Sequence, residues 1–343
     1  MRQSGITVIT PAATQWDAFV DQHPEGHPLQ QSRWAAVKQA TGWESLRIGV
    51  CDDGALLAGA QVLIKRRYGL SAWYVPRGPV LADDHLLNQA LVAAIRGQAA
   101  KQRAVFVRYE PNMLVGAARE RMVTRLFDGP AYVRGESLQP QHSVFVDLEQ
   151  SADTLLLAMT KGHRADIKKA AKQGVSVRSG TTDADLDRFV ALMVETGARA
   201  GFAVHSKAYY ADVWQRFRSQ RRAELLIAEH DGQAVAAAII VASPQVACYL
   251  YGGSNAAAFA CGANHAIQWQ ALQWAQAQGC AAYDFWGIPY RTDSTDAAPE
   301  QSEMAGLIRF KKGFGGREVS FHAAATDVLM PRVYRYAASR FSL

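Results

Sequence analysis

The chain has 343 residues, of which 49% are hydrophobic and 20% are charged. This composition is typical of folded globular proteins and excludes the disordered and fibrous classes. The formal net charge of +6 favours a polyanionic partner, such as a nucleic acid or a nucleotide-linked molecule, although many basic proteins bind neither. No apolar run reaches the ~18 residues of a membrane-spanning helix, because the best candidate, residues 234–241, is followed by Ser243 and Pro244.

The four cysteines form no recognisable metal or redox motif. No two of them stand in a Cys-x-x-Cys pair, and no nearby histidine has the spacing of a metal ligand, so we expect neither a bound metal nor a cofactor. Each is predicted to be a small buried apolar residue: Cys51, Cys248, Cys261 and Cys280. Residues 1–5 lead into a strand-like stretch without the apolar core of a signal peptide, which favours a cytoplasmic protein.

The first half of the chain predicts a hairpin followed by a strand, a helix and a second strand. Two strand-like runs, 46–50 and 55–65, flank Asp52-Asp53-Gly54, a sequence that closes hairpins. The next three elements are a strand at 72–75, a helix at 84–101 and a buried strand at 104–109.

The second half predicts the same order of elements: strands at 223–229 and 234–242 around Asp231-Gly232, a strand at 246–251, a helix at 263–278 and a strand at 281–285. Each series ends at an acidic residue, Glu110 or Asp284. A strand-helix-strand passage of this length is a right-handed crossover, which places ligands beyond the strand ends. The order resembles the core of the GNAT acetyltransferase superfamily, present twice, and implies an α/β (α+β) fold of two GNAT-like domains in tandem. A chance likeness between two general α/β stretches is the alternative.

Extra helices precede the second series. Residues 152–173 predict one helix with a strongly cationic face, since its basic residues recur at three- and four-residue spacing: Lys161, Arg164, Lys168, Lys169 and Lys172. Such a face suits RNA phosphate, and a solvated surface is the alternative. Helices are also expected at 185–199 and 208–218, but no heptad pattern is long enough for a coiled-coil arm.

Three residues of the first half are candidates for binding or chemistry. Residues 31–38 predict the start of a helix that Ser32 caps. Lys38 lies one helical turn after Trp34, where it could hold a phosphate or be a solvated neighbour of a core tryptophan. Arg77, in the stiff sequence Pro76-Arg77-Gly78-Pro79, could face an anion or simply accompany a turn. Glu110 ends a strand immediately before a proline, and a desolvated carboxylate there could accept a proton, whereas most strand-end carboxylates are solvated or structural.

The second half contains two further candidate segments. Residues 249–254 close a strand with two tyrosines and two glycines. The helix start at 261–264 faintly resembles the pyrophosphate loop of acyl-CoA-binding acetyltransferases. It departs from the full pattern, since Phe259 stands at the loop's polar first position and Asn264 at its small last position. In residues 307–314, Leu307, Phe310 and Phe314 share a helical face that is expected to be buried. Lys311 beside them is either an ordinary surface lysine or a lysine whose ammonium is held against a cleft. In the second case it could stabilise negative charge that develops on a carbonyl oxygen or a leaving ribose.

Together these segments resemble the Fem family of peptidoglycan-bridge aminoacyltransferases, in particular its compact FemX-like (FemXAB) members. The resemblance spans nearly the whole chain, and its order is more specific than any single motif. The matching segments are Q-S-x-W-x-x-x-K (31–38), Y-x-P-R-G-P (74–79), E-P (110–111), K-x-x-R-x-x-I-K-K-A (161–170), R-x-x-F (199–202), Y-x-G-S (251–254), Y-D-F-x-G (283–287) and L-x-x-F-K-x-x-F (307–314).

The resemblance implies two domains with separate tasks: residues 1–148 with 319–343 on the side of the precursor, and residues 149–318 on the side of aminoacyl-tRNA. It also implies roles for individual residues. By matching position, Lys38 is expected to contact the precursor's diphosphate, and Tyr209 and Tyr251 to line the same channel. Phe310 and Lys311 are expected at the aminoacyl ester, and Glu110 matches a proposed base. The basic helix is expected to contact tRNA through Lys161, Arg164, Lys168 and Lys169. Where the family pattern places an arginine for the diphosphate, this chain has His205, so Arg199 or Lys207 substitutes for it or the substrate is presented differently.

The resulting hypothesis is a transferase that moves an amino acid from aminoacyl-tRNA to the side-chain amine of a stem peptide, on UDP-MurNAc-pentapeptide or lipid II. An acyl-CoA-dependent N-acyltransferase and a non-catalytic tRNA- or precursor-binding protein are the alternatives. The basic, aromatic stretch 332–341 suits either a packed helix or a peripheral contact with the inner face of the membrane.

Overall fold

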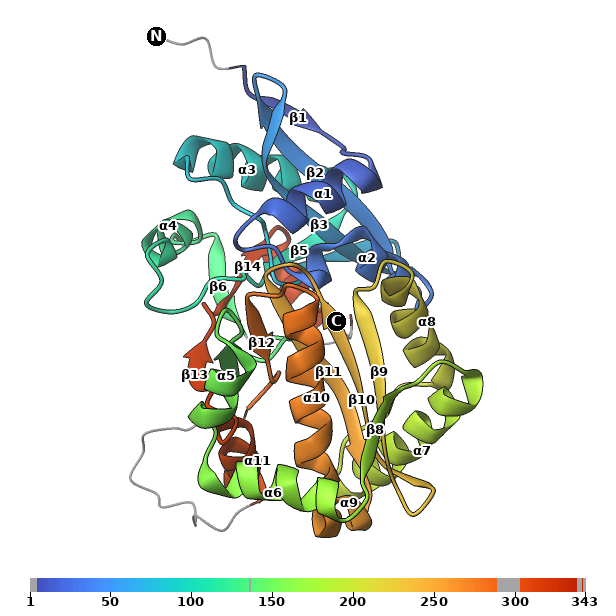
Figure 1. Ribbon diagram of the computed structural model, residues 1–343. Coiled ribbons are helices and arrows are strands. Elements are labelled where there is room, and N and C mark those ends of the chain that lie inside the picture. Colours follow the sequence, from blue (N-terminus) through green and yellow to red (C-terminus); the bar gives the residue numbers. More distant parts are fainter. Residues whose placement is uncertain (1–4, 136, 289–302, 338–340, 342–343) are drawn as a thin grey trace, which may run out of the picture. The chain divides into compact units, whose positions relative to one another are not determined.

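The computed structural model describes residues 5–135, 137–288, 303–337 and 341 (Figure 1). Contacts within the chain divide it into two units. Unit 1 comprises Met1–Gln141 and Ser320–Leu343, and unit 2 comprises His142–Val319. Strand β7 (His142–Asp147) therefore belongs to unit 2, where it pairs with β12 (Ala282–Asp284).

Unit 1 is built on a seven-stranded sheet in the order β1-β2-β3-β4-β5-β14-β6. All neighbouring strands are antiparallel except β4 and β5, which are parallel and joined by helix α3. The strands are β1 (Thr7–Ile9), β2 (Glu44–Asp52), β3 (Ala55–Arg67), β4 (Leu70–Val75), β5 (Ala104–Tyr109), β6 (Tyr132–Gly135) and β14 (Ala324–Val328).

Helices cover both faces of this sheet because alternate strand residues point to opposite sides. Trp73 and Val107 face the core beneath α3, while their neighbours Ala72 and Phe106 pack against Tyr334 on the other face. The helices of unit 1 are α1 (Ala13–Gln22), α2 (Ser32–Gln39), α3 (His85–Lys101), α4 (Glu120–Leu126) and α12 (Pro331–Ala337).

Unit 2 has a second seven-stranded sheet in the order β13-β7-β12-β11-β10-β9-β8. Strands β11 and β12 are its parallel pair, and helix α10 joins them. The remaining strands are β8 (Ser176–Ser179), β9 (Ala223–His230), β10 (Gln233–Ala242), β11 (Val246–Ser254) and β13 (Arg317–Ser320).

Helix α10 (Ala263–Ala277) packs on one face of this sheet, in front of it in Figure 1. Helices α7 (Asp183–Ala200) and α8 (Lys207–Arg218) also pack on the sheet, chiefly against β9, β10 and β11. The other helices are α5 (Ala152–Ala158), α6 (Lys161–Lys172), α9 (Ala256–Cys261) and α11 (Glu303–Lys312). Within the described residues no helix forms a coiled-coil arm.

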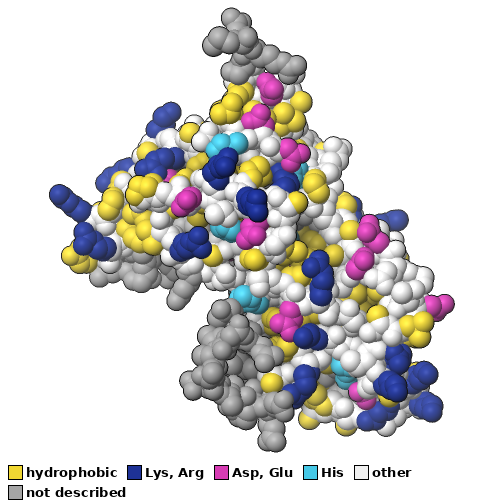
Figure 2. Space-filling view, turned by 90° about the vertical axis from the view of Figure 1, so that its left-hand side faces the viewer, with side chains coloured by type: hydrophobic (Ala, Val, Ile, Leu, Met, Phe, Trp, Pro, Cys, Tyr) yellow, Lys and Arg dark blue, Asp and Glu magenta, His cyan; other side chains and the backbone are white. Residues whose placement is uncertain are grey.

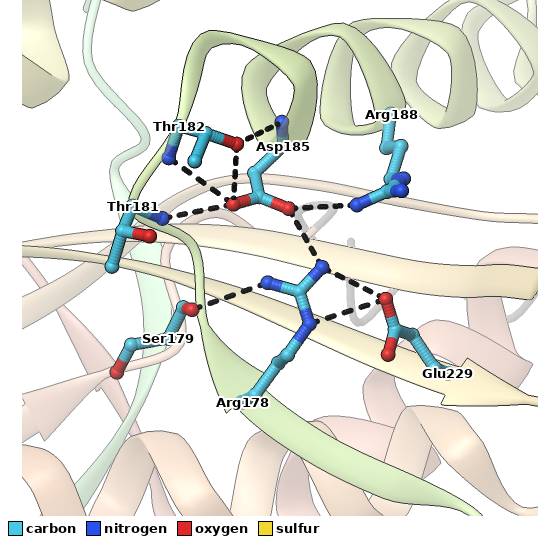
Figure 3. Close-up of polar contacts among 7 residues, drawn as sticks. All are labelled: Arg178, Ser179, Thr181, Thr182, Asp185, Arg188 and Glu229. Atoms are coloured by element: carbon cyan, nitrogen blue, oxygen red, sulfur yellow. Dashed lines mark hydrogen bonds and ion pairs between the residues drawn. The ribbon is translucent and has the colours of Figure 1, made fainter. Parts of the chain in front are cut away.

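The start of α7 is fixed by a polar network around Asp185, a residue with only 2% of its surface exposed (Figure 3). Thr182 and Asp185 form a capping box, in which each side chain accepts from the other's backbone N–H. Arg178 of β8 donates to Asp185 at 2.6 Å and to Glu229 of β9 at 2.8 Å, and Arg188 donates to Asp185 at 2.9 Å. The network ties α7 to the edge of the sheet, and its cations hold the pKa of Asp185 well below the usual range.

The two units repeat one topology, a hairpin followed by a parallel strand pair across a helix, but they differ where the parallel strands end. In unit 1 the pair β4–β5 stays closed, since Glu110 N–H donates to Val75 O and Gly78 N–H donates to Glu110 O. In unit 2 the pair β11–β12 runs only as far as Cys248 and Asp284. Beyond that point β11 continues beside β10 through a bulge, while Phe285 N–H donates to Val144 O on β7. Only the second pair opens, as ligand-binding α/β sheets do at the carboxyl ends of their strands.

Three predictions of local structure were wrong. Residues 152–173 form two helices and not one, because Met159 and Thr160 are extended and Thr160 caps the second. Leu307 is 42% exposed, and Ile308 occupies the buried face of α11 in its place. Ser32 does not cap α2, since it is the first helical residue and its hydroxyl donates to Asp17.

Other predictions were confirmed within the part of the chain that the structure describes. All four cysteines are buried and none forms a disulfide. As a separate observation, none of the described helices has the length and apolar character that a membrane span requires. Of the predicted tail helix, Pro331–Ala337 is helical, and residues 338–340 lie outside the described residues.

Candidate active site

Lys311 lies on α11 with its ammonium group next to the opened end of β12. The residue is 6% exposed, and Nζ donates to the carbonyl oxygens of Trp286 and Gly287, both at 2.6 Å. Burial lowers the pKa of Lys311 to about 8, and the nearby Asp284 opposes that shift. The group is therefore mostly cationic at pH 7. Two of its three N–H donors hold the main chain, and an ammonium has a third.

Asp284 shapes the main chain that holds Lys311. This fully buried carboxylate accepts from the hydroxyl of Ser143 and, at 2.7 Å, from the N–H of Trp286. Trp286 has a φ of +57°, a conformation that is strained for a bulky residue and is concentrated at functional sites. The sequence identified the Tyr283–Gly287 motif, but it could not show that the carbonyl groups after Asp284 would bind Lys311.

Phe310, beside Lys311, belongs to a group of rings that also contains His163, His265 and Phe314. The ring of His163 lies 4.6 Å from that of His265 and 4.7 Å from that of Phe314. Its Nε2 is 2.8 Å from the carbonyl oxygen of Phe310. Both histidines were missed by the sequence analysis, because no local motif signals contacts between residues so far apart in the chain; His163 and Phe310 are separated by 147 positions.

A second aromatic group lies around the far half of β11, where that strand has left β12. The hydroxyls of Tyr209 and Tyr251 are 3.1 Å apart, and the His205 ring stacks on Tyr209 at 4.1 Å. Burial raises the pKa of Tyr209 to about 12 and that of Tyr251 well above its usual value. Both phenols are therefore neutral hydrogen-bonding groups at pH 7. The structure thus brings together three of the predicted substrate-binding residues.

The two cations expected to substitute for an arginine at position 205 are engaged in other contacts. Arg199 donates to Ser254 O at 2.9 Å, and its guanidinium lies over the ring of Phe259. Lys207 pairs with Asp183 at 2.7 Å and with an aspartate one helical turn later, Asp187, at 2.6 Å.

The basic helix α6 exposes all four of its lysines. Lys161, Lys168, Lys169 and Lys172 are on the surface, whereas Arg164 is half-buried and donates to Leu157 O and Met159 O at the end of α5. Figure 2 shows Lys and Arg side chains gathered near the lower edge of the face that it draws, at the end of the molecule where α6 lies in Figure 1. Arg164 thus anchors the helix, and the lysines form its charged surface.

In unit 1, Lys38 lies in a site made of two lysines and two tryptophans. Its Nζ is 4.9 Å from the centre of the Trp34 ring. Burial and the charge of Lys65 lower the pKa of Lys38 to about 8. Lys65 in turn lies over Trp43 at 5.3 Å and donates to Thr41 O. Lys65 was not singled out in the sequence, where the only signal was a Lys-Arg-Arg run at a strand end.

Glu110 lies inside unit 1 at the end of β5 and is 3% exposed. Its carboxylate accepts from the hydroxyl of Tyr74 at 2.7 Å and from the N–H groups of Leu138 and Gln139. Burial raises the pKa of Glu110, and these hydrogen bonds oppose the shift.

Arg77 is also buried in unit 1, with 2% of its surface exposed. Its guanidinium lies 3.6 Å from the centre of the Phe321 ring and donates to Pro140 O. Arg77 and Glu110 therefore both hold residues 138–140 against the end of the sheet.

The match to a family model decides the family. The model described as the FemAB family matches residues 12–234 and 223–322. The chain belongs to the FemAB family. The predicted family is thereby confirmed, and together with the names of the curated relatives below the match also confirms the predicted class of enzyme, an aminoacyltransferase.

Curated relatives and a solved structure agree with this membership. The lipid II:glycine glycyltransferase of Staphylococcus epidermidis is 24% identical over 88% of this chain and 88% of its own length. The protein of the same name from Staphylococcus aureus is 28% identical over 63% of this chain and 53% of its own length. The crystal structure of FemX has a TM-score of 0.86 at 21% identity, covering 96% of this chain and 99% of that one.

A more distant structure confirms the predicted fold class. A tandem GNAT protein from the clavulanic acid biosynthesis pathway has a TM-score of 0.54 at 12% identity, over 94% of this chain and 98% of that chain. Among the described residues, no three His, Cys, Asp or Glu side chains are grouped so that they could hold a metal ion.

Proposed function

We propose that this FemAB-family enzyme transfers an amino acid from aminoacyl-tRNA to the side-chain amine of the stem peptide in a peptidoglycan precursor. The observation that carries the proposal is the buried ammonium of Lys311, held by two carbonyl groups where the parallel strands of unit 2 part. The relatives' shared name supports lipid II as the acceptor and glycine as the first amino acid to test.

The reaction is an aminolysis of an ester. The amine nitrogen attacks the aminoacyl carbonyl, a C–N bond forms, the C–O bond to the ribose breaks, and the proton lost by the amine ends on the released ribose hydroxyl. Negative charge develops on the carbonyl oxygen and then on the ribose oxygen. A preorganised cation in a dry site stabilises such charge by several kcal/mol, and we assign this task to Lys311. Phe310 provides the apolar wall beside it.

Other residues are assigned to substrate binding and proton transfer. Lys38, with its partly desolvated ammonium, is the proposed contact for the precursor's diphosphate, and Tyr209, Tyr251 and His205 are proposed as neutral contacts with the precursor. Glu110 remains the proposed base, because burial raises its pKa toward the range in which a carboxylate accepts a proton. Arg77 and Arg199 are proposed to support these sites through the contacts described above.

The exposed lysines of α6 are the proposed contact for the acceptor arm of tRNA. Lys161, Lys168 and Lys169 carry charge on the surface of unit 2, the unit that also contains Lys311, and Arg164 fixes the helix to α5. Phosphate attraction of this kind depends on charge and not on base sequence, so one helix can serve different tRNAs.

The position of α6 also bears on the acyl-CoA alternative. An acyl-CoA pyrophosphate would bind the exposed N–H groups at the start of α10, but α6 lies against that end. A Cβ atom at Gly262 would be 2.6 Å from Asp166 O of α6, and the Asp166 carboxylate is 3.6 Å from His265 Nε2 in the first turn of α10. Asp166 of α6 therefore lies close to the start of α10 and brings a carboxylate there, which disfavours a pyrophosphate and supports aminoacyl-tRNA as the donor.

A direct test is to incubate the purified protein with lipid II and a mixture of aminoacyl-tRNAs, and separately with lipid II and acetyl-CoA. We expect the precursor to gain the mass of an aminoacyl residue only in the first reaction. Transfer from acetyl-CoA alone would refute the proposal.

A variant separates an enzyme from a non-catalytic binding protein. Lys311→Met keeps the length and packing of the side chain, so it should abolish transfer while tRNA and precursor still bind. The matched control is Lys312→Met, which removes an exposed lysine paired with Glu318 and should leave the rate unchanged. An unchanged rate for Lys311→Met would exclude the assigned role.

A further inference from the structure

The last turn of α11, which carries Phe310 and Lys311, is capped by a side chain from another helix. The last four carbonyl groups of a helix have no partner within it, and α11 ends at Lys312, so the Phe310 carbonyl is one of these. His163, in the first turn of α6, places Nε2 at 2.8 Å from this oxygen. The cap therefore spans 147 positions of sequence.

The partners of the His163 ring fix which nitrogen carries the proton. The Phe310 carbonyl can only accept, so Nε2 carries the hydrogen and donates. In the neutral ring Nδ1 must then accept, and the Thr160 hydroxyl lies 2.8 Å away to donate to it. Thr160 is the N-cap residue of α6, and its own N–H donates to Gly313 O at 2.9 Å. Two hydrogen bonds thus join the start of α6 to the end of α11.

The contact leaves no room for adjustment. A Cβ atom at Gly313 would lie 1.9–2.4 Å from atoms of the His163 imidazole, so only glycine fits there. The ring is also confined edge-to-face by His265 and Phe314. Both the orientation of the ring and the position of the α11 backbone are therefore determined.

We infer that His163 is a positioning residue, which fixes the end of α11, and with it Lys311, to the start of the basic helix α6. This inference rests on the proposed function, since it concerns the geometry of the proposed catalytic lysine. It adds that the helix assigned to tRNA and the helix assigned to catalysis form one rigid element. A 1 Å displacement of a reacting group can lower a rate about 100-fold.

The test compares three variants of the full-length protein in the lipid II assay with aminoacyl-tRNA. His163→Phe keeps a ring against His265 and Phe314 but cannot donate to the Phe310 carbonyl. His163→Gln places an amide N–H close to the position of Nε2. His265→Phe is the matched control. The His265 ring belongs to the same aromatic group, but among the described residues the hydrogen bond from this group to α11 comes from His163.

For His163→Phe we expect kcat to fall about 10- to 100-fold with the KM for aminoacyl-tRNA within about twofold, because orientation and not binding is lost. His163→Gln should recover most of this loss, and His265→Phe should stay within about threefold of the wild type. The alkaline limb of the pH profile, set by Lys311 beside Asp284, should move to higher pH in His163→Phe as the ammonium becomes better solvated.

Three results would overturn the inference: an unchanged kcat in folded His163→Phe, no recovery in His163→Gln, or an equal loss in His265→Phe. Each of these leaves the proposed function intact if Lys311→Met is inactive. Absence of transfer by the wild-type protein would instead refute the proposed function.

Discussion

Lys311 and Lys38 both have a pKa near 8, yet their surroundings differ. Lys311 is desolvated but holds two carbonyl oxygens and lies near Asp284, so its site contains the groups that favour a cation. Lys38 is desolvated over Trp34, and the neighbouring charge of Lys65 lowers its pKa as well. The first arrangement suits a cation that is fixed before the reaction, and the second places two positive charges close together, which suits contact with a polyanionic group such as a diphosphate.

The pKa of Lys311 predicts how the rate depends on pH. Because the folded-state pKa is about 8, the ammonium is present below pH 8 and is lost as pH rises through that value. The rate constant kcat should therefore decline above pH 8 in the wild type and in Lys312→Met. Lys311→Arg should react more slowly but without this decline, since a guanidinium does not lose its proton in that range. A decline that persists unchanged in Lys311→Arg would contradict the assignment.

The environment of Lys38 predicts a defect in binding. Lys38→Met removes the charge proposed to face the diphosphate but keeps most of the contact with Trp34. The KM for the precursor should rise about tenfold or more, as expected for loss of a charge-assisted contact of roughly 1.5–3 kcal/mol, with kcat nearly unchanged. Lys101→Met, at an exposed position on α3, is the control. A fall in kcat without a change in KM would place Lys38 elsewhere in the mechanism.

At the scale of elements, α6 predicts a dependence on salt. Replacing Lys168, Lys169 and Lys172 by glutamine should raise the KM for aminoacyl-tRNA. If each lysine contacts one phosphate, the change should also reduce the magnitude of the slope of log kcat/KM against log salt by about two to three units. A control with the same change in net charge replaces Lys101, Arg121 and Arg125 in unit 1 by glutamine. Equal slopes for the two variants would show that only the overall charge matters.

The network at the start of α7 predicts an effect on stability and not on catalysis. Asp185→Asn removes the anion between Arg178 and Arg188, which should lower the free energy of unfolding at pH 7 by about 2–4 kcal/mol in urea titrations. Asp183→Asn, an exposed change in the same helical turn, should cost less than ~1 kcal/mol.

The effect at Asp185 should also depend on pH. Its folded-state pKa lies below the unfolded value of about 4, so its contribution is complete above pH 4 and is lost as pH falls below it. The difference between wild type and Asp185→Asn should shrink over that range.

At the scale of the whole molecule, the sequence predicted what is local and periodic. The two hairpins were marked by Asp-Gly turns, and each parallel pair was marked by a helix of crossover length between two apolar runs. These signals were enough for the duplicated GNAT-like topology. The break at Met159 was missed, because no proline marks it and only the extended backbone of Met159 and Thr160 separates the two helices.

The candidate site was predictable only in part, for a physical reason. Lys311 and Tyr251 belong to motifs that can be recognised in order along the chain. The partners that determine their chemistry, such as the Trp286 carbonyl and the His163 ring, are brought close by tertiary packing and leave no local pattern. Exposure was equally hidden, since nothing in the sequence showed that Arg77 would be buried against Phe321.

The position of β14 has a consequence for how the chain folds during synthesis. This strand lies between β5 and β6, so the sheet of unit 1 lacks an internal strand until residues 324–328 have been made. All the strands of unit 2 except β13 precede that point by at least 40 residues. Although domains usually fold in order from the N-terminus, the second unit can here complete its sheet before the first. Until β14 arrives, the unpaired edges of β5 and β6 are places where a nascent chain could pair wrongly.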